Sequence, residues 1–375
     1  MSKLYLPHSD QFDTMNEHLA TIAKALKADV DISTWASVQK AVRAGIAPEL
    51  IPVGTQLSVE HSVYGNMLFD VVAHNHHKSA YNTSTMTLMC HSNLAGIQFD
   101  SPEAFYYADN GLVAGDYNFT IPKTYSSWVA GTYQFTLTQS LPQGGQLCIS
   151  GRADEAITSK KVVSYASRTD TVAIESVVIT SGNGGVNLGT FGEELNHTER
   201  ISYGSNNYKE SALRQFLNSS AKAGSVWFPQ TKFDRPPSWA TSLDGFIDGL
   251  DKDFLDVVGE VVVPCSTNNT YESLDSTTIK GGKYTVIDKF YIPSQTEILG
   301  TTTEIVADDS VRFPYYKNTT SADYIKYRAD SPLTWWVRSA CSWSATSIRI
   351  INSSGVPHSS DAISNGGCVP TCTIV

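Results

Sequence analysis

The stretch from Trp335 to the C-terminus constrains the fold more than any other part of the chain. It opens with the apolar run Trp335–Ser339 and closes with Cys368–Val375, and both runs are typical of buried strands. Between them, residues 339–366 are mainly Ser, Thr, Ala, Asn and Gly, with Arg349 and Asp361 as the only charged side chains of the Asp, Glu, Lys and Arg types. The pattern indicates a firmly framed sheet that displays small polar side chains, which suits a binding surface better than a catalytic site.

Composition narrows the class of protein. A chain of 375 residues can bury one large core or two modest ones. Only 17% of residues are charged and 18 are Tyr, which favours β-structure. The net charge of −10 argues against a basic surface for nucleic acid or anionic membranes. No apolar stretch has the length of a transmembrane helix, and the N-terminus lacks the features of a signal peptide, so we expect synthesis in the cytoplasm and no membrane insertion.

Periodicity predicts helices first, then strands, then helices and strands again, which favours an α+β fold over a doubly wound sheet. The first helix should span 33–44, with Asp31 or Ser33 as its N-cap and Gly45 beyond its end. Further helices are predicted at 208–218 and 252–258. Strands are predicted at 56–60, 67–73, 85–90, 171–180 and 285–292.

Two patterns bear on assembly. Residues 114–120 and 130–136 form a weak repeat of alternating aromatic and polar residues, which predicts neighbouring antiparallel strands. Near the N-terminus, five apolar residues follow a 3-4-3-4 spacing that places them on one helical seam: Phe12, Met15, Leu19, Ile22 and Leu26. Such a seam suits either a short coiled coil, for which we expect a homotrimer, or a helix packed on its own domain.

Candidate metal and catalytic groups are sparse. A His-based metal site is conceivable if two strands pair, but no Cys or carboxylate has a ligand-like spacing to the four histidines concerned, His74, His76, His77 and His91. Because His76 and His77 are adjacent, they would face opposite sides of a strand, so a polar loop without metal is favoured. The acidic run from Asp244 to Asp256 misses the spacing of a calcium loop and is better interpreted as an amphipathic helix.

The six cysteines are widely spaced and are interpreted as buried thiols rather than as a disulfide framework. No nucleophile elbow, Cys–His signature or phosphate-binding loop is present in the sequence. We therefore expect no enzymatic activity and no cofactor.

Several separated motifs resemble an uncharacterised domain family with a C-type-lectin-like fold, found in gut bacterial and prophage proteins. The resemblance covers roughly residues 200–375 and rests on Tyr203–Asn218, Phe233–Pro237, Gly245–Phe246, Gly249–Asp251, Pro293–Gly300 and Trp335–Ser339. Within that fold, the C-terminal segment is similar to the variable region of diversity-generating retroelement proteins. In these, a reverse transcriptase rewrites adenines at the end of the gene and the fold displays the altered residues.

The resemblance implies a fold and a domain organisation. Residues 1–47 would form a helical oligomerisation segment, and residues 48–375 a C-type-lectin-like, formylglycine-generating-enzyme-like domain interrupted by a β-rich insertion at about 105–195. The alternative is two consecutive domains that meet near residue 195. The chain departs from the family at its closing strand, where Gly367-Cys368-Val369-Pro370 replaces a Gly-Val-Arg-Pro-like sequence.

The resemblance also implies a function: a phage or prophage virion protein of the tail or surface that binds a protein or glycan on a host cell. The framing residues would be Trp335, Trp336 and Arg338, whereas Trp343 would be an exposed contact residue. The expected ligand-binding residues lie in the display segment, about 339–366, and are Ala340, Ser342, Trp343, Ser344, Thr346, His358, Ser359, Ser360, Asp361, Ser364 and Asn365. Two alternatives are an enzyme of the formylglycine-generating type, which needs a reactive pair such as Cys368 and Cys372, and a purely structural virion protein.

Overall fold

The computed structural model describes residues 32–77, 82–94, 96–121, 130–150, 161–165, 172–173, 178–179, 185–190, 200–201, 203–268 and 281–375. Over these residues the chain is rich in strands with short helices between them, and the predicted α+β class is confirmed. The apolar seam from Phe12 to Leu26 lies outside the described residues. Among the described residues, no helix is both long enough and apolar enough to cross a membrane.

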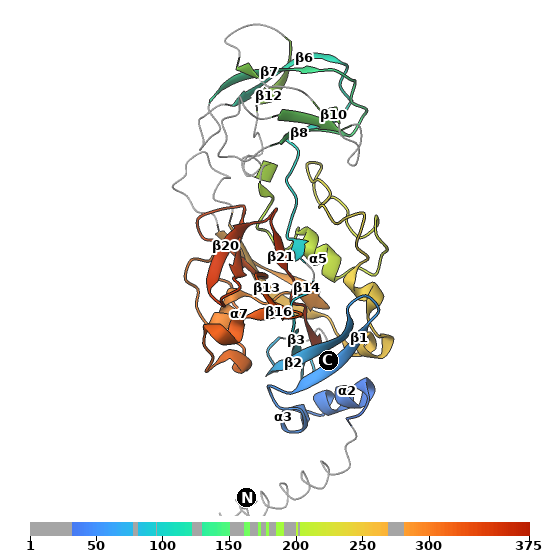
Figure 1. Ribbon diagram of the computed structural model, residues 1–375, viewed down its shortest axis with the longest axis vertical. Coiled ribbons are helices and arrows are strands. Elements are labelled where there is room, and N and C mark those ends of the chain that lie inside the picture. Colours follow the sequence, from blue (N-terminus) through green and yellow to red (C-terminus); the bar gives the residue numbers. More distant parts are fainter. Residues whose placement is uncertain are drawn as a thin grey trace, which may run out of the picture.

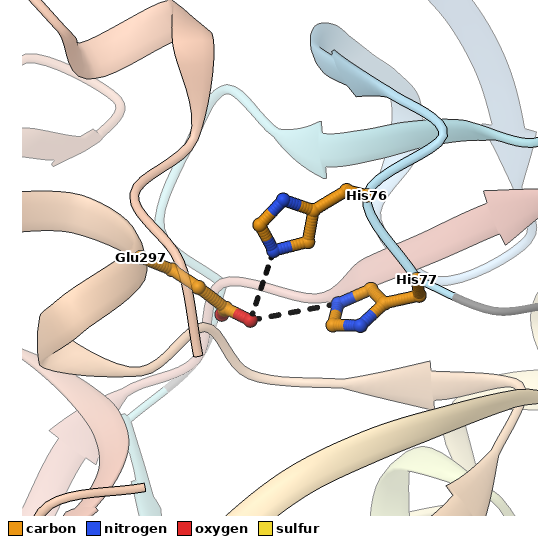
Figure 2. Close-up of side chains that lie close together, drawn as sticks. All are labelled: His76, His77 and Glu297. Carbon is orange, nitrogen blue, oxygen red and sulfur yellow. Dashed lines mark ion pairs between the residues drawn. The ribbon is translucent and has the colours of Figure 1, made fainter. Parts of the chain in front are cut away.

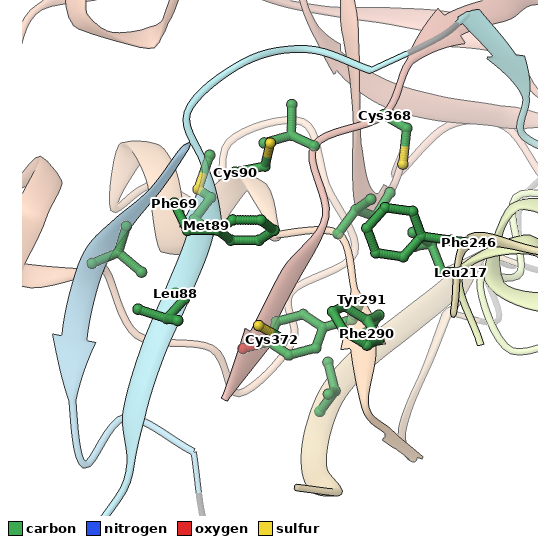
Figure 3. Packing of buried hydrophobic residues seen from close by; sticks show 14 of the residues in the cluster. Phe69, Leu88, Met89, Cys90, Leu217, Phe246, Phe290, Tyr291, Cys368 and Cys372 are labelled. Atoms are coloured by element: carbon green, nitrogen blue, oxygen red, sulfur yellow. The ribbon is translucent and has the colours of Figure 1, made fainter. Parts of the chain in front are cut away.

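The first and last of the described strands lie in one five-stranded sheet, in which every neighbouring pair is antiparallel. Its order is β1 (Gln56–His61), β2 (Gly65–His74), β3 (Met86–Cys90), β22 (Thr371–Ile374) and β15 (Phe290–Tyr291). The C-terminal strand therefore lies between an early strand and a late one. Figure 3 shows the apolar residues packed around β3 and β22, among them Leu88, Met89 and Cys372.

A second five-stranded sheet carries the display segment. Its order is β20 (Pro357–Asp361), β19 (Ser347–Ile351), β18 (Trp335–Ala340), β21 (Asn365–Gly367) and β4 (Gly96–Gln98). All six residues of β18 are buried, so both faces of this central strand are covered. A tight turn at 352–355 joins β19 to β20, with the Val356 carbonyl accepting from the Asn352 amide at 2.9 Å.

Two smaller hairpins flank this sheet. They are β13 (Val261–Asn268) with β14 (Gly281–Asp288), and β16 (Lys326–Arg328) with β17 (Ser331–Leu333). Residue 289 separates β14 from β15, so the strand predicted at 285–292 is divided between two sheets.

A second apolar core, separate from the main one, lies in a β-rich unit at the end of the molecule opposite the first helices (Figure 1). Its strands are β5 (Tyr106–Ala108), β6 (Gly115–Ile121), β7 (Gly131–Leu137), β8 (Gly145–Ser150), β9 (Lys161–Tyr165), β10 (Val172–Ala173), β11 (Val178–Ile179) and β12 (Val186–Thr190). The two repeats are β6 and β7, which pair antiparallel as predicted, and the rings of Phe119 and Tyr133 stack 5.4 Å apart. At 171–180, the described strands are only the two-residue β10 and β11.

The helices are short, and all of the α-helices described except α3 begin at a side-chain cap. They are α2 (Trp35–Arg43), α3 (Ala47–Leu50), α5 (Ala212–Leu217), α6 (Lys252–Val257) and α7 (Gln295–Leu299), with 3-10 turns η2 (Phe246–Gly249), η3 (Pro314–Tyr316) and η4 (Ser321–Tyr324). The expected N-cap of α2 was wrong. Thr34 caps it, because its hydroxyl accepts from the Ser37 amide while the Ser37 hydroxyl accepts from the Thr34 amide. Likewise α5 begins only at Ala212, since Ser211 is its cap.

All six cysteines are free and buried, which confirms the prediction of buried thiols. Burial raises the pKa of Cys90 to about 11 and that of Cys148 to about 12.

Candidate functional site

The expected ligand-binding residues of the display segment differ in how exposed they are. Three of its expected contact residues are exposed, Trp343, His358 and Asn365, and five are partly exposed, Ser342, Ser359, Ser360, Asp361 and Ser364. Trp343 is 44% exposed, so its predicted exposure is confirmed, and the framing residues Trp335, Trp336 and Arg338 are fully buried, as predicted.

The expectation that Ala340, Ser344 and Thr346 lie on the display surface was wrong, because all three are buried. Ala340 is the last residue of the central strand β18. The Ser344 hydroxyl accepts from the amides of Thr346 and Ser347 at 3.2 and 3.1 Å and contacts the Thr346 hydroxyl at 3.1 Å. Ser344 therefore satisfies backbone amides of the loop that holds Trp343, and none of the three buried side chains is available to a ligand.

The alternation of side chains along a strand divides the predicted residues of β20 between the two faces of the sheet. In the pairing of β19 with β20, Arg349 lies opposite Ser359, and Ile350 lies opposite His358. Because paired residues share a face and successive residues alternate, Ser359 and Asp361 lie on the face of Arg349, whereas His358 and Ser360 lie on the other. Fewer of the predicted residues therefore surround Trp343 than the sequence analysis expected.

Trp343 rests on a buried arginine. The Arg349 guanidinium lies 5.7 Å from the centroid of the Trp343 ring. Its Nε donates to Gln295 Oε1 of α7 at 2.8 Å, and its Nη2 lies 3.1 Å from Glu304 Oε2. With only 2% of Arg349 exposed, the cation is fixed from the scaffold side and orients the exposed indole.

Glu304 is a member of this surface that the sequence did not indicate. Its side chain is 56% exposed, and its backbone has φ of +63°, which is uncommon for a residue with a side chain. The Glu304 carbonyl accepts from the Ser342 amide at 3.2 Å, which ties the two loops together. We call Ser342, Trp343, Ser359, Asp361 and Glu304 the tryptophan patch.

A second cluster, made of charged side chains and histidines, is buried where β18 meets α7. Arg338 of β18 and Glu297 of α7 form a bidentate ion pair, with Nη1–Oε2 and Nη2–Oε1 distances of 2.7 and 2.6 Å and no exposure on either side chain. Burial alone would raise the pKa of Glu297, but the attraction of Arg338 and the hydrogen bonds from His76 and Arg338 hold it below the ordinary value.

Two of the four candidate histidines converge on that carboxylate. His76 Nε2 and His77 Nε2 each lie 3.5 Å from Glu297 Oε1, and Figure 2 shows both rings directed at it. The expectation that adjacent histidines face opposite ways was wrong here. β2 ends at His74 and Asn75 has φ of +54°, so strand alternation no longer applies.

The other two histidines lie elsewhere. His74 Nε2 is 3.0 Å from the Ile51 carbonyl oxygen, and His91 Nδ1 is 2.9 Å from Asp70 Oδ2. Glu297 was missed as a partner because it is remote in sequence and has no ligand-like spacing to the histidines.

The acidic run does not converge on a cation site. The Lys222 ammonium lies 3.1 Å from Asp244 and 2.7 Å from Asp248. Asp251 caps α6 by accepting from the amides of Asp253 and Phe254.

Comparison with known proteins yields one family. The model of a domain of unknown function, DUF6273, matches residues 170–375, more than half of the chain, and the chain therefore belongs to that family. No curated protein and no solved structure matches it.

Proposed function

We propose that this member of the DUF6273 family is a non-catalytic binding protein whose tryptophan patch contacts a protein or glycan on a host cell. The observation that carries the proposal is Trp343, a half-exposed indole held on a buried Arg349. A large ring whose orientation is already fixed loses little conformational freedom on binding, and such anchored aromatic residues dominate many interfaces.

The neighbouring polar groups fit this role. Ser342, Ser359 and Asp361 are partly exposed, and Glu304 adds a second carboxylate beside the ring. A flat apolar face bordered by hydroxyls and carboxylates suits the apolar face of a sugar or a peptide with exposed donors.

We further propose that residues 48–375 adopt the C-type-lectin-like fold with an insertion at about 105–195. Two features support it: β22 pairs with β3, so the two ends of this region meet in one sheet, and β5 to β12 enclose their own core. In that fold the exposed and partly exposed display residues would be the ones that vary, and the chain would act as a homo-oligomeric virion protein.

The formylglycine-generating alternative is less well supported. It needs a reactive cysteine pair, yet Cys368 and Cys372 are both free and fully buried. Burial raises the pKa of both thiols, which disfavours the nucleophilic thiolate at neutral pH.

A binding experiment tests the proposal. Full-length protein is applied to a glycan array and to intact gut bacterial cells, beside Trp343→Ala and the control Phe228→Ala. Phe228 is also an exposed aromatic residue, at 59%, but it lies outside the patch. We expect the wild type and Phe228→Ala to bind equally and Trp343→Ala to lose binding. Equal binding by all three would reject the patch, and binding by none would favour the purely structural alternative.

The proposed virion and retroelement context has its own test. Sequencing the DNA beside the gene should find a reverse transcriptase gene and a near-copy of codons 335–375. Isolates that differ evenly along the whole chain would contradict a variable display segment.

A further inference from the structure

The buried cluster of His76, His77 and Glu297 brings together three side-chain atoms that can each bind a cation. Two imidazole nitrogens and one carboxylate oxygen lie within 4.8 Å of one another. The two nitrogen-to-oxygen distances are 3.5 Å. Ligands of a tetrahedral zinc ion at about 2.0–2.1 Å are separated by about 3.3 Å, so these distances are near those of a bound site.

The hydrogen bonding of His77 fixes which nitrogen carries the proton. One ring nitrogen bonds to the Val262 carbonyl and must donate to it, whereas Nε2 is buried and has no hydrogen-bond partner. Nδ1 is therefore the protonated nitrogen, and the Nε2 lone pair faces the Glu297 carboxylate. The Nε2 lone pair of His77 is thus free to bind a cation placed between it and the carboxylate oxygen. A metal-binding histidine has this same pattern, with its second nitrogen donating to a backbone carbonyl.

The surroundings can orient the carboxylate and offset a metal's charge. Arg338 holds both oxygens of Glu297, and such hydrogen-bonded carboxylates are common among metal ligands. Asp308, 7% exposed, interacts electrostatically with both Arg338 and Glu297, and its Oδ2 has no hydrogen-bond partner. Asp308 thus places a second carboxyl group beside the Arg338–Glu297 pair, where it would offset part of the charge of a divalent ion.

We propose that His76, His77 and Glu297 bind one divalent transition-metal ion of the zinc class. Two imidazoles and one carboxylate are donors that Zn²⁺ favours, whereas Ca²⁺ and Mg²⁺ favour oxygen ligands. The ion would tie the end of β2 to α7 and, through Arg338, to the central strand of the display sheet.

Zinc titration of the whole chain tests this inference. Tag-free protein is stripped with a chelator, titrated with zinc chloride by calorimetry, and assayed for zinc per chain after gel filtration. The variants are His76→Ala and His77→Gln, with His91→Ala as the matched control, because His91 lies near the acidic Asp70 away from the cluster. Circular dichroism checks that each variant is folded.

We expect one tight site per chain in the wild type and in His91→Ala. His76→Ala should bind at least about 100-fold more weakly, since losing a ligand costs more than losing an outer partner. The His76 side chain is less buried than that of His77, so this variant decides the question even if His77→Gln does not fold. A wild type that takes up no zinc, or a folded His76→Ala that binds zinc as tightly as the wild type, would overturn the proposal.

Discussion

The guanidinium of Arg349 lies against the indole of Trp343, 5.7 Å from its ring centroid, while Glu304 and Gln295 hold the same guanidinium from the scaffold. The exposed ring is thus oriented by a residue that belongs to the core. This arrangement separates the contact residue from the residues that stabilise the fold, and the two can be changed independently.

Trp343→Ala should lower the free energy of unfolding by only about 0.5–1 kcal/mol, because it removes a half-exposed ring and one cation–π contact. Trp336→Ala should lower it by about 3–5 kcal/mol, since Trp336 is fully buried and its Nε1 donates to the Ile97 carbonyl at 2.7 Å. Urea denaturation measures both. Equal losses would mean that Trp343 is part of the core.

Gly366→Ala should destabilise the protein by about 1–3 kcal/mol. A Cβ on Gly366 would lie 2.5 Å from Cε2 of the Trp336 ring, in a core with no room for the ring to shift. Gly282→Ala is the matched control, because a Cβ there meets nothing within 4 Å. Thermal unfolding of both variants should show a clear drop only for Gly366→Ala, and similar midpoints would contradict the packing described.

Arg338→Met should cost about 3–5 kcal/mol, because it leaves the buried Glu297 carboxylate without its partner. Arg338→Met combined with Glu297→Leu should cost less than the sum of the single changes, since no uncompensated charge remains. A double-mutant cycle by chemical denaturation gives the coupling. Additive losses would show that the pair is not coupled.

Stability should fall as the pH is lowered below about 6.5, partly through His61. Its Nδ1 accepts from the Val63 amide and its Nε2 donates to the Phe246 carbonyl, which fixes a neutral ring. Desolvation lowers the pKa of His61 below 6.5 in the folded state, although its bond to Phe246 opposes this. Below pH 6.5 the unfolded chain therefore binds a proton that the folded chain does not, and folding loses free energy.

His61→Asn should consequently show a smaller loss of stability between pH 8 and pH 5 than the wild type, each compared with its own value at pH 8. Thermal melts at several pH values measure the slope. An unchanged slope would mean that His61 does not contribute.

The six thiols should resist a water-soluble thiol reagent in the native protein and react fully after unfolding, because each is buried and free. Absorbance of the released chromophore counts the reacted thiols. Rapid reaction of Cys368 or Cys372 in the folded protein would support the alternative that the protein is an enzyme of the formylglycine-generating type.

Local sequence patterns predicted the structure correctly where the question concerned the burial or pairing of a single strand. The apolar run at Trp335–Ser339 is a buried strand, and the repeats at 114–120 and 130–136 are paired strands, because periodicity reports which side of an element is buried. Caps were less certain: Thr34, Ser33 and Asp31 are all good cap residues, and only the reciprocal hydrogen bonds with Ser37 show which one begins the helix.

The sequence by itself determined the α+β class, the buried framing of the display segment, the exposed Trp343 and the buried thiols, since these follow from periodicity and residue type. Only the tertiary structure showed that Ala340, Ser344 and Thr346 are buried, because small polar residues suit a surface and a hydrogen-bonded loop equally well. Only the tertiary structure showed that Glu297 lies beside His76 and His77, and that Glu304 lies near Trp343. Those contacts join residues that are remote in sequence, or residues whose direction is set by a left-handed backbone conformation nearby. No local sequence pattern predicts such contacts.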